Sequence, residues 1–383
     1  MNTLYDIIGI PLGYLMSWIY KFIPNYAVAI IIFTLVIKLV LFPVSYKIQK
    51  NSARIQLLQP KLQKIQKSFA NNPTRQQQEM QKLYQEEGVN QAASCLPMVI
   101  QMLLLFGVID VVYKPITHIL HITKSVRTAA IEKASQLATE FGLINGGRAI
   151  SSSDLRNELY TIEALSKYPD DFKNISENFA QVVSDFSAKF TVFGANLGKT
   201  PTLHPETWNQ EAVILCIIPF MAGIAQLLVS VYSMIHQKKT NPNPQAGGGC
   251  MWLMMLGMPI WSIWLAFSLP AGVGYYWIWS SLFSFLVTLG LNLYFTPAKI
   301  EQVNEKEKEK ARIYAEKHPE KKTFMQRMME QAMLAEQQNG DSVNLNKDGS
   351  KMSRSEQNKA NIDTIKEARK RMAEKYGDEY NDN

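Results

Sequence analysis

Long apolar runs alternate with polar stretches along the chain. Charged residues are scarce at 26–46, 95–113, 212–235 and 250–298. An apolar run of about 17–25 residues can cross a hydrocarbon core roughly 30 Å thick. The last run is long enough for two spans, because a tight turn at 268–271 interrupts it. The pattern predicts an all-α polytopic membrane protein with a core of five transmembrane helices, and it excludes a single soluble globule.

The polar stretches between these runs complete the predicted division of the 383 residues. The expected segments are an interfacial amphipathic helix (1–23), the first span (24–46), a helical hairpin (47–94), the second span (95–115), an inserted helical domain (116–210), the third span (211–235), a loop (236–250), the fourth span (251–267), the fifth span (272–296) and a charged tail (297–383).

The first 23 residues have the spacing of an amphipathic helix. One helical face carries apolar residues at intervals of three and four: Ile8, Leu12, Leu15, Ile19 and Phe22. Asp6 is the only charge before Lys21, and no small-residue cleavage site follows, so a signal peptide is not indicated. The stretch is short and is broken by Pro11, which favours a helix lying in the membrane interface over the alternative, a sixth span.

The net charge is +7, and its placement predicts the orientation of the spans. The hairpin at 47–94 holds eight basic residues against three acidic ones, so the positive-inside rule places it in the cytoplasm. Residues 116–210 hold nine basic against ten acidic residues, which suits an external domain. We therefore expect a multi-pass membrane protein with its N-terminus outside and its C-terminus in the cytoplasm.

Lys38 lies inside the first predicted span, about 18 Å from its outer end at about 1.5 Å per residue. A charge at the bilayer centre costs about 2.5–3.5 kcal/mol on insertion scales, so an intramembrane lysine is a functional candidate by default. The alternative is a lysine that snorkels to the interface. The depth of Lys38 favours the functional interpretation.

Three predicted spans each carry a stripe of polar residues at helical spacing. The stripes are Thr34, Lys38 and Ser45 in the first span, Gly223, Gln226, Ser230 and Ser233 in the third, and Ser281, Ser284, Thr288 and Asn292 in the fifth. Lipid cannot satisfy these groups. They either hydrogen-bond from helix to helix or line a water-filled cavity, and an unpaired lysine favours the cavity.

Asp110 in the second span is a candidate partner for Lys38. By helical rise it lies about 10 Å nearer the outer surface than Lys38. We expect no direct pair between them, and we expect Asp110 to reach the outer interface. Gln101, nine residues earlier, lies on the opposite face of the same helix.

Signatures of covalent chemistry are absent from the sequence. His118 and His121 have helical spacing but no third ligand nearby, which favours a chance pair over a metal site. Cys95, Cys216 and Cys250 lie far apart at or within apolar runs, which is typical of small buried side chains rather than of disulfides. We expect no catalytic residue, no metal and no cofactor.

Several stretches, taken in order, resemble the YidC family of membrane protein insertases. They are Asn25–Ile31 leading to Lys38 and Phe42-Pro43, Leu58–Lys61, Leu83–Asn90, Cys95–Met98 with Gln101-Met102, and Ser268–Gly272 with Tyr276-Trp277. Ile10–Leu12 with Trp18-Ile19 likewise resembles the interfacial helix that precedes the first core span in that family. The combination is specific, although each piece alone is not.

The resemblance implies an insertase and chaperone with a hydrophilic groove open to the cytoplasm and to lipid but closed outside. The groove would receive hydrophilic parts of nascent membrane proteins while their apolar segments enter the bilayer, without covalent catalysis. The residues assigned to it are Lys38, Thr34, Gln101, Gln226, Ser230, Ser281 and Ser284. The implied partners are nascent membrane proteins, the ribosome, the Sec translocon and the lipid bilayer.

The chain departs from the family pattern at several places. The family usually has arginine at the position of Lys38; lysine keeps the charge but loses the planar five-donor fork. Asp110 replaces a residue that is commonly apolar or aromatic. Residues 116–210 form a longer external segment than is usual, and we expect an accessory helical cap there. The resemblance also implies the short bacterial type, located in the bacterial cell membrane, without the large external domain that some members carry before the first core span.

Two further hypotheses concern function. A small-solute channel or transporter is the alternative, because it would also explain polar stripes and an intramembrane cation; no repeat relating two halves is evident, which disfavours it. The tail carries a basic cluster that predicts contact with ribosomal RNA: Lys366, Arg369, Lys370, Arg371 and Lys375.

Overall fold

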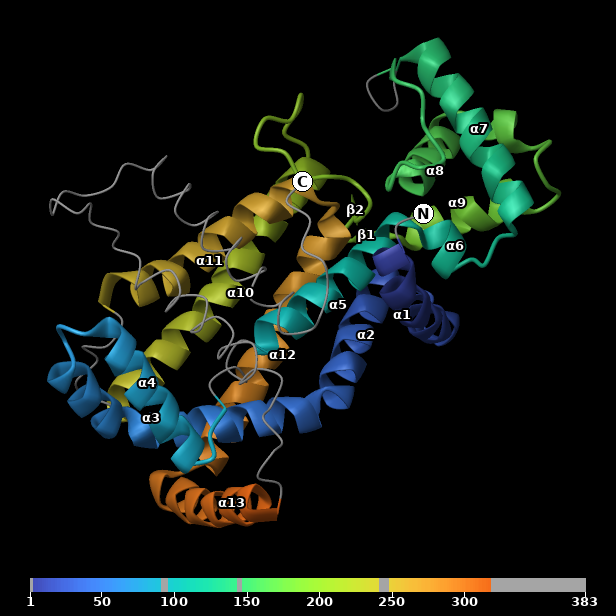
Figure 1. Cartoon of the computed structure of the whole chain (residues 1–383). Coiled ribbons are helices and arrows are strands. Elements are labelled where there is room, and N and C mark those ends of the chain that lie inside the picture. The colour runs from blue at the N-terminus through green and yellow to red at the C-terminus, as the bar shows by residue number, and fades with distance from the viewer. Residues whose placement is uncertain (1–2, 91–95, 143–146, 241–247, 318–383) are drawn as a thin grey trace, which may run out of the picture. The chain divides into compact units, whose positions relative to one another are not determined.

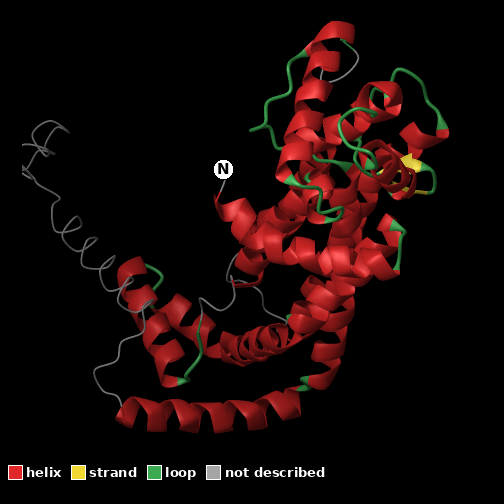
Figure 2. Ribbon diagram, turned by 90° about the vertical axis from the view of Figure 1, so that its right-hand side faces the viewer, coloured by secondary structure: helices red, strands yellow, loops and turns green. Residues whose placement is uncertain are grey.

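The computed structural model describes residues 3–90, 96–142, 147–240 and 248–317. These ranges are mainly helical, as Figure 2 shows, and their only strands form one two-stranded hairpin. The predicted all-α class is confirmed. The basic cluster at 366–375 lies outside the described residues, and so do part of the predicted loop at 236–250 and Cys95.

The elements follow one another along the chain as labelled in Figure 1. They are α1 (Thr3–Phe22), α2 (Tyr26–Val40), α3 (Phe42–Ser68), α4 (Pro73–Glu86), α5 (Leu96–Tyr113), α6 (Pro115–His118), α7 (Lys124–Phe141), α8 (Asn157–Lys167), η3 (Pro169–Phe172), α9 (Phe179–Lys189), β1 (Thr191–Val192), β2 (Ala195–Asn196), α10 (Gln210–Thr240), α11 (Gly248–Ser268), α12 (Ala271–Tyr294) and α13 (Pro297–Lys317).

Within the described residues, three helices are long and apolar enough to cross a membrane: α5, α10 and α12. The bent pair α2 and α3 is a fourth candidate if it is taken as one broken span. In α11 the stretch Pro259–Ser268 is apolar but shorter than a full membrane span. These helices agree with a polytopic membrane protein, and the count of five spans stays a prediction.

The first predicted span differs from expectation at its end. The helix changes direction at Leu41, and α2 and α3 meet at 57°. Pro43 explains the position of the bend, because proline lacks an N–H and clashes with the carbonyl four residues earlier. It is well tolerated in the first turn of a helix, which is where it lies in α3. The apolar run therefore contributes its last residues to α3 rather than to one straight span.

Helices α3 and α4 form a hairpin that is fastened to α13. Arg54 is buried, and its guanidinium donates to the carbonyls of Glu87 and Gly88 and to Asn304 Oδ1 of α13. Burial lowers the pKa of Arg54, while Glu307 and Glu87 oppose that effect. The start of the charged tail is thus a helix packed along α3 (Figure 1).

At the other end of the spans, residues 116–210 share a hydrophobic core with α1, α2, α5, α10 and α12. Tyr26, the first residue of α2, packs edge-on against Phe190, with ring centroids 4.4 Å apart. We call this the insertion end of the spans, and the end next to α3, α4 and α13 the hairpin end. The names describe contacts and imply no side of the membrane.

Asp110 is fully buried, so the expectation that it reaches the outer interface is wrong. Its carboxylate lies 2.5 Å from Lys114 Nζ and 2.7 Å from His118 Nε2. Helix α1 covers the cluster: a Cβ placed on Gly9 would lie 2.1 Å from Asp110 Oδ2, and one on Gly13 would lie 2.4 Å from His118 Nδ1. Gly9 and Gly13 thus let α1 approach the Asp110 cluster closely.

Candidate functional site: a polar line between α2, α10 and α12

Lys38 extends from the last turn of α2 toward α12. Its Nζ donates to Ser284 Oγ at 2.8 Å, and the Ser284 hydroxyl donates to the Ser280 carbonyl at 2.7 Å. In the part of the chain that the structure describes, no carboxylate lies within ion-pair distance of Lys38. Within the described residues, the ammonium group of Lys38 is therefore hydrogen-bonded to a hydroxyl but not neutralised by a carboxylate. It can attract a negatively charged group that enters the site.

The polar contacts continue in both directions along α12. Ser281 Oγ donates to Gln226 Oε1 of α10 at 3.1 Å. Toward the hairpin end, Asn292 Nδ2 donates to the Tyr232 hydroxyl at 3.5 Å, and its Oδ1 accepts from Gln49 of α3. From Ser281 to Asn292 the line covers about 16 Å along the helix axis at about 1.5 Å per residue. We call Lys38, Gln49, Gln226, Tyr232, Ser281, Ser284 and Asn292 the polar line.

Not every residue assigned to the groove belongs to this line. Thr34 is fully buried, and its hydroxyl donates to the Ile30 carbonyl of its own helix at 2.6 Å, so the structure does not bring it to the line. Ser230 is partly buried on α10, and Gln101 is partly buried on α5 near the Tyr276 hydroxyl. The structure unites four of the predicted residues, namely Lys38, Gln226, Ser281 and Ser284.

Sequence reasoning missed two members of the line. Ser45 follows Lys38 after seven residues and Gln49 follows Ser45 after four, so a helical face extended past the apolar run would have included Gln49. Tyr232 is apolar apart from its hydroxyl, so the spacing of polar residues in this span does not single it out. Polar periodicity carried across the end of the apolar run would have revealed Gln49.

Helix α5 is packed by protein along only half of its length. The seven residues Gly107–Tyr113 at the insertion end are all buried. Toward the hairpin end the exposed residues are Leu96, Pro97, Met98, Val99, Met102 and Leu103. The bundle is thus closed around α5 at the insertion end and open beside it at the hairpin end, which is also the end that holds the polar line.

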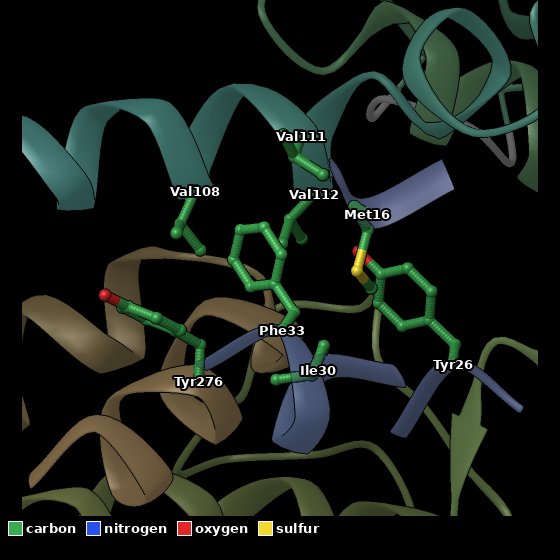
Figure 3. Close-up of a pocket in the computed structure, with 8 residues that line it drawn as sticks. All are labelled: Met16, Tyr26, Ile30, Phe33, Val108, Val111, Val112 and Tyr276. Atoms are coloured by element: carbon green, nitrogen blue, oxygen red, sulfur yellow. The ribbon is translucent and has the colours of Figure 1, made fainter. Parts of the chain in front are cut away.

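An apolar layer separates the polar line from the insertion end. Figure 3 shows its side chains around a small cavity, with Phe33 of α2 directed toward the valines of α5. The lining residues are Met16, Tyr26, Ile30, Phe33, Val108, Val111, Val112 and Tyr276. Tyr276 precedes Ser284 by eight residues, or about 12 Å of helix. No charged side chain belongs to this lining, so the layer is suited to block water and ions rather than to bind a polar ligand.

The fold and the site together define an all-α polytopic membrane protein with a lysine on an internal polar line. The family described as "60Kd inner membrane protein" matches residues 18–299, more than two thirds of the chain, and the chain belongs to this family. The resemblance to the YidC insertases is confirmed.

Relatives named "Membrane protein insertase YidC" match a shorter stretch. The protein of Granulibacter bethesdensis is 37% identical over 103 residues, which cover 27% of this chain and 18% of the relative. The protein of Brucella suis biovar 1 is 40% identical over 103 residues, 27% of this chain and 17% of the relative. That of Chlorobium phaeovibrioides is 45% identical over 91 residues, 24% and 16% respectively. The chain thus aligns with less than a fifth of the length of these relatives.

Proposed function

We propose that this protein inserts nascent membrane proteins into the bilayer and assists their folding. The observation that carries the proposal is Lys38, a cation that has no carboxylate partner among the described residues, on a polar line at the half of the bundle where α5 is exposed. A hydrophilic segment of a client could lie along this line while its apolar segment meets lipid beside α5. The membership of the family supports the same conclusion.

The physical work of such a site is to lower the free energy of a polar segment within the bilayer. Unsatisfied backbone and side-chain groups in hydrocarbon each cost several kcal/mol, about 2–7 for an amide or hydroxyl. Hydroxyls and amides of the polar line offer hydrogen bonds, and Lys38 offers charge. The apolar layer around Phe33 closes the path at the insertion end, so that a client can enter without opening a pore.

The proposed orientation places the hairpin and the tail in the cytoplasm and the insertion outside. The hairpin supports this by its excess of basic residues. The nascent chain, the ribosome and the Sec translocon are proposed partners on that side. A channel or transporter for small solutes is not favoured, because the apolar layer separates the polar line from the insertion end.

The proposal is tested by depletion of the protein in its own cell, followed by quantitative proteomics of the membrane fraction. We expect a subset of integral membrane proteins, enriched in those with short translocated hydrophilic tails, to fall at least twofold before growth stops. Purified protein in vesicles should restore the insertion of one such client. A cell that keeps its membrane proteome and changes only in solute uptake would contradict the insertase and favour the transporter.

A further inference from the structure

Arg156, at the start of α8 in the insertion, contacts the ends of two core helices, α5 and α11. Its Nη2 donates to the Ser268 carbonyl at the end of α11 at 2.8 Å, and its Nη1 donates to Thr200 Oγ1 at 3.2 Å. The guanidinium also lies over the ring of Tyr113, the last residue of α5, 5.6 Å from the centroid. The planar fork of arginine serves all three contacts at once, which lysine cannot do.

A second contact of the insertion fixes the start of α12. The amides of Ala271 and Gly272 donate to the carbonyls of Lys199 and Leu197 at 2.9 and 2.8 Å. The first amides of a helix have no acceptor within the helix, so these two carbonyls satisfy donors that would otherwise be unpaired. Leu197 is fully buried between the spans. One residue earlier, the Asn196 amide donates to Glu211 Oε1 of α10 at 3.1 Å.

These contacts converge where α5 is buried. The half of α5 that ends at Tyr113 is enclosed, whereas its other half is exposed beside the polar line. Helix α5 packs mainly against α1, and α12 mainly against α10 and α2. The insertion therefore adds contacts between the ends of α5 and α12, two helices that contact each other only sparsely.

We propose that Arg156, Leu197, Lys199 and Thr200 form an outer clamp that positions α5 against α12 during insertion, with Arg156 as its main positioning residue. The clamp makes the insertion end of α5 a fixed point, so that its hairpin end can move away from α12 to admit a client. The inference rests on the proposed insertase function. It replaces the expectation that residues 116–210 are an accessory cap.

The test measures one distance and one activity on the full chain. Cys95, Cys216 and Cys250 are changed to serine, and nitroxide labels are attached at Met102→Cys on α5 and Leu286→Cys on α12, both exposed in the structure. Pulsed electron paramagnetic resonance in lipid nanodiscs gives the distance distribution. Insertion of a client is measured in vesicles that contain the same unlabelled variants.

The variants are Arg156→Ala, Arg156→Lys and Thr200→Val. Lys173→Ala is the matched control, because Lys173 is an exposed cation of the insertion paired only with nearby Asp170.

We expect Arg156→Ala to widen the distance distribution at least twofold and to lower insertion at least threefold. Arg156→Lys should give intermediate values for both, and Lys173→Ala should match the parent. If Arg156→Ala does not fold, Thr200→Val decides, since it removes one acceptor and no charge; we then expect a smaller widening with a smaller loss of insertion.

Two outcomes would overturn the clamp. One is a folded Arg156→Ala or Thr200→Val variant with an unchanged distance distribution. The other is a widened distribution with full insertion, which would make the contact structural only. If the parent protein itself inserts no client, the proposed function fails, whereas the distance measurement still decides whether the clamp holds α5.

Discussion

Lys38 is the residue on which the proposed function depends most. Its ammonium group donates to the Ser284 hydroxyl, and within the described ranges of the chain no carboxylate pairs with it. Lys38→Arg should retain insertion, because the charge is kept. Lys38→Ala should lower insertion severalfold, and Lys38→Glu should lower it further for clients whose translocated segment is acidic, since like charges then meet in a medium of low dielectric.

The measurement is insertion of paired clients that differ only in acidic or neutral residues of the translocated tail. Lys47→Ala is the control, because Lys47 is an exposed basic residue beyond the bend and is not a member of the polar line. Normal insertion of acidic clients by Lys38→Glu would remove the electrostatic explanation.

Gly9 is a position where the packing leaves no room for a side chain larger than the hydrogen of glycine. A Cβ there would lie 2.1 Å from Asp110 Oδ2, whereas one on Gly290 in α12 would meet nothing within 4 Å. We expect Gly9→Ala to destabilise the protein by about 1–3 kcal/mol, the usual effect of overpacking. Gly290→Ala should be neutral or stabilising by up to about 1 kcal/mol, because alanine favours the helix.

Thermal unfolding of the two glycine variants in the same detergent makes the comparison. A Gly9→Ala midpoint equal to that of the parent would show that α1 does not pack on Asp110 as described.

At the scale of elements, α13 is the part of the tail that the hairpin holds. Asn304 is buried and accepts from Arg54 at 2.8 Å, so Asn304→Ala removes one of the three acceptors of a buried guanidinium. The expected loss is about 1–3 kcal/mol in the docking of α13 on α3, the cost of leaving a buried donor unpaired. Glu305→Ala, at an exposed position of the same helix, should have no such effect.

Hydrogen–deuterium exchange reports this docking directly. In Asn304→Ala the amides of α13 should exchange at least tenfold faster than in the parent, while those of α12 stay protected. Equal exchange in both variants would mean that the Arg54 contact does not fasten the helix.

The same contact region predicts a dependence on pH. Burial raises the pKa of Glu87, but Lys61 and Lys308 outweigh it and hold that pKa below its ordinary value. A carboxylate with a lowered pKa in the folded state stabilises above its unfolded pKa, and this contribution is lost as the pH falls through the folded value. Lower protection of the α13 amides, relative to their intrinsic exchange rates, is therefore expected below about pH 4.5. Glu87→Gln should reduce that pH dependence, and the remainder belongs to Glu307 of α13, which pairs with Lys50 of α3 and also has a lowered pKa.

At the scale of the whole molecule, the insertion should be indispensable. Replacing residues 125–205 by a short linker removes Arg156 and both carbonyls that satisfy the start of α12. We expect a lower unfolding midpoint and loss of insertion, in contrast to the expectation drawn from the sequence. A folded, membrane-located deletion variant with full activity would restore the view of 116–210 as an accessory.

The sequence determined the elements of this protein and the chemistry of its site. Apolar runs predicted α5, α10 and α12, because a span must satisfy its backbone within itself. Helical spacing likewise placed Lys38, Ser281, Ser284 and Gln226 on faces that meet. Such properties are local, so they can be read along one chain segment.

Only the tertiary structure decided which faces meet and how closely. The sequence put Asp110 at a boundary by counting residues, but α1 covers it and His118 and Lys114 pair with it. The contact of Arg156 with Ser268 joins residues 112 positions apart. Neither contact follows from periodicity. The spacing of residues shows which of them share a helical face, but it does not show which other helix packs on that face. For that reason the sequence predicts an accessory cap at 116–210, whereas the contacts of Arg156, Leu197 and Lys199 with the ends of the spans are the basis for proposing a clamp.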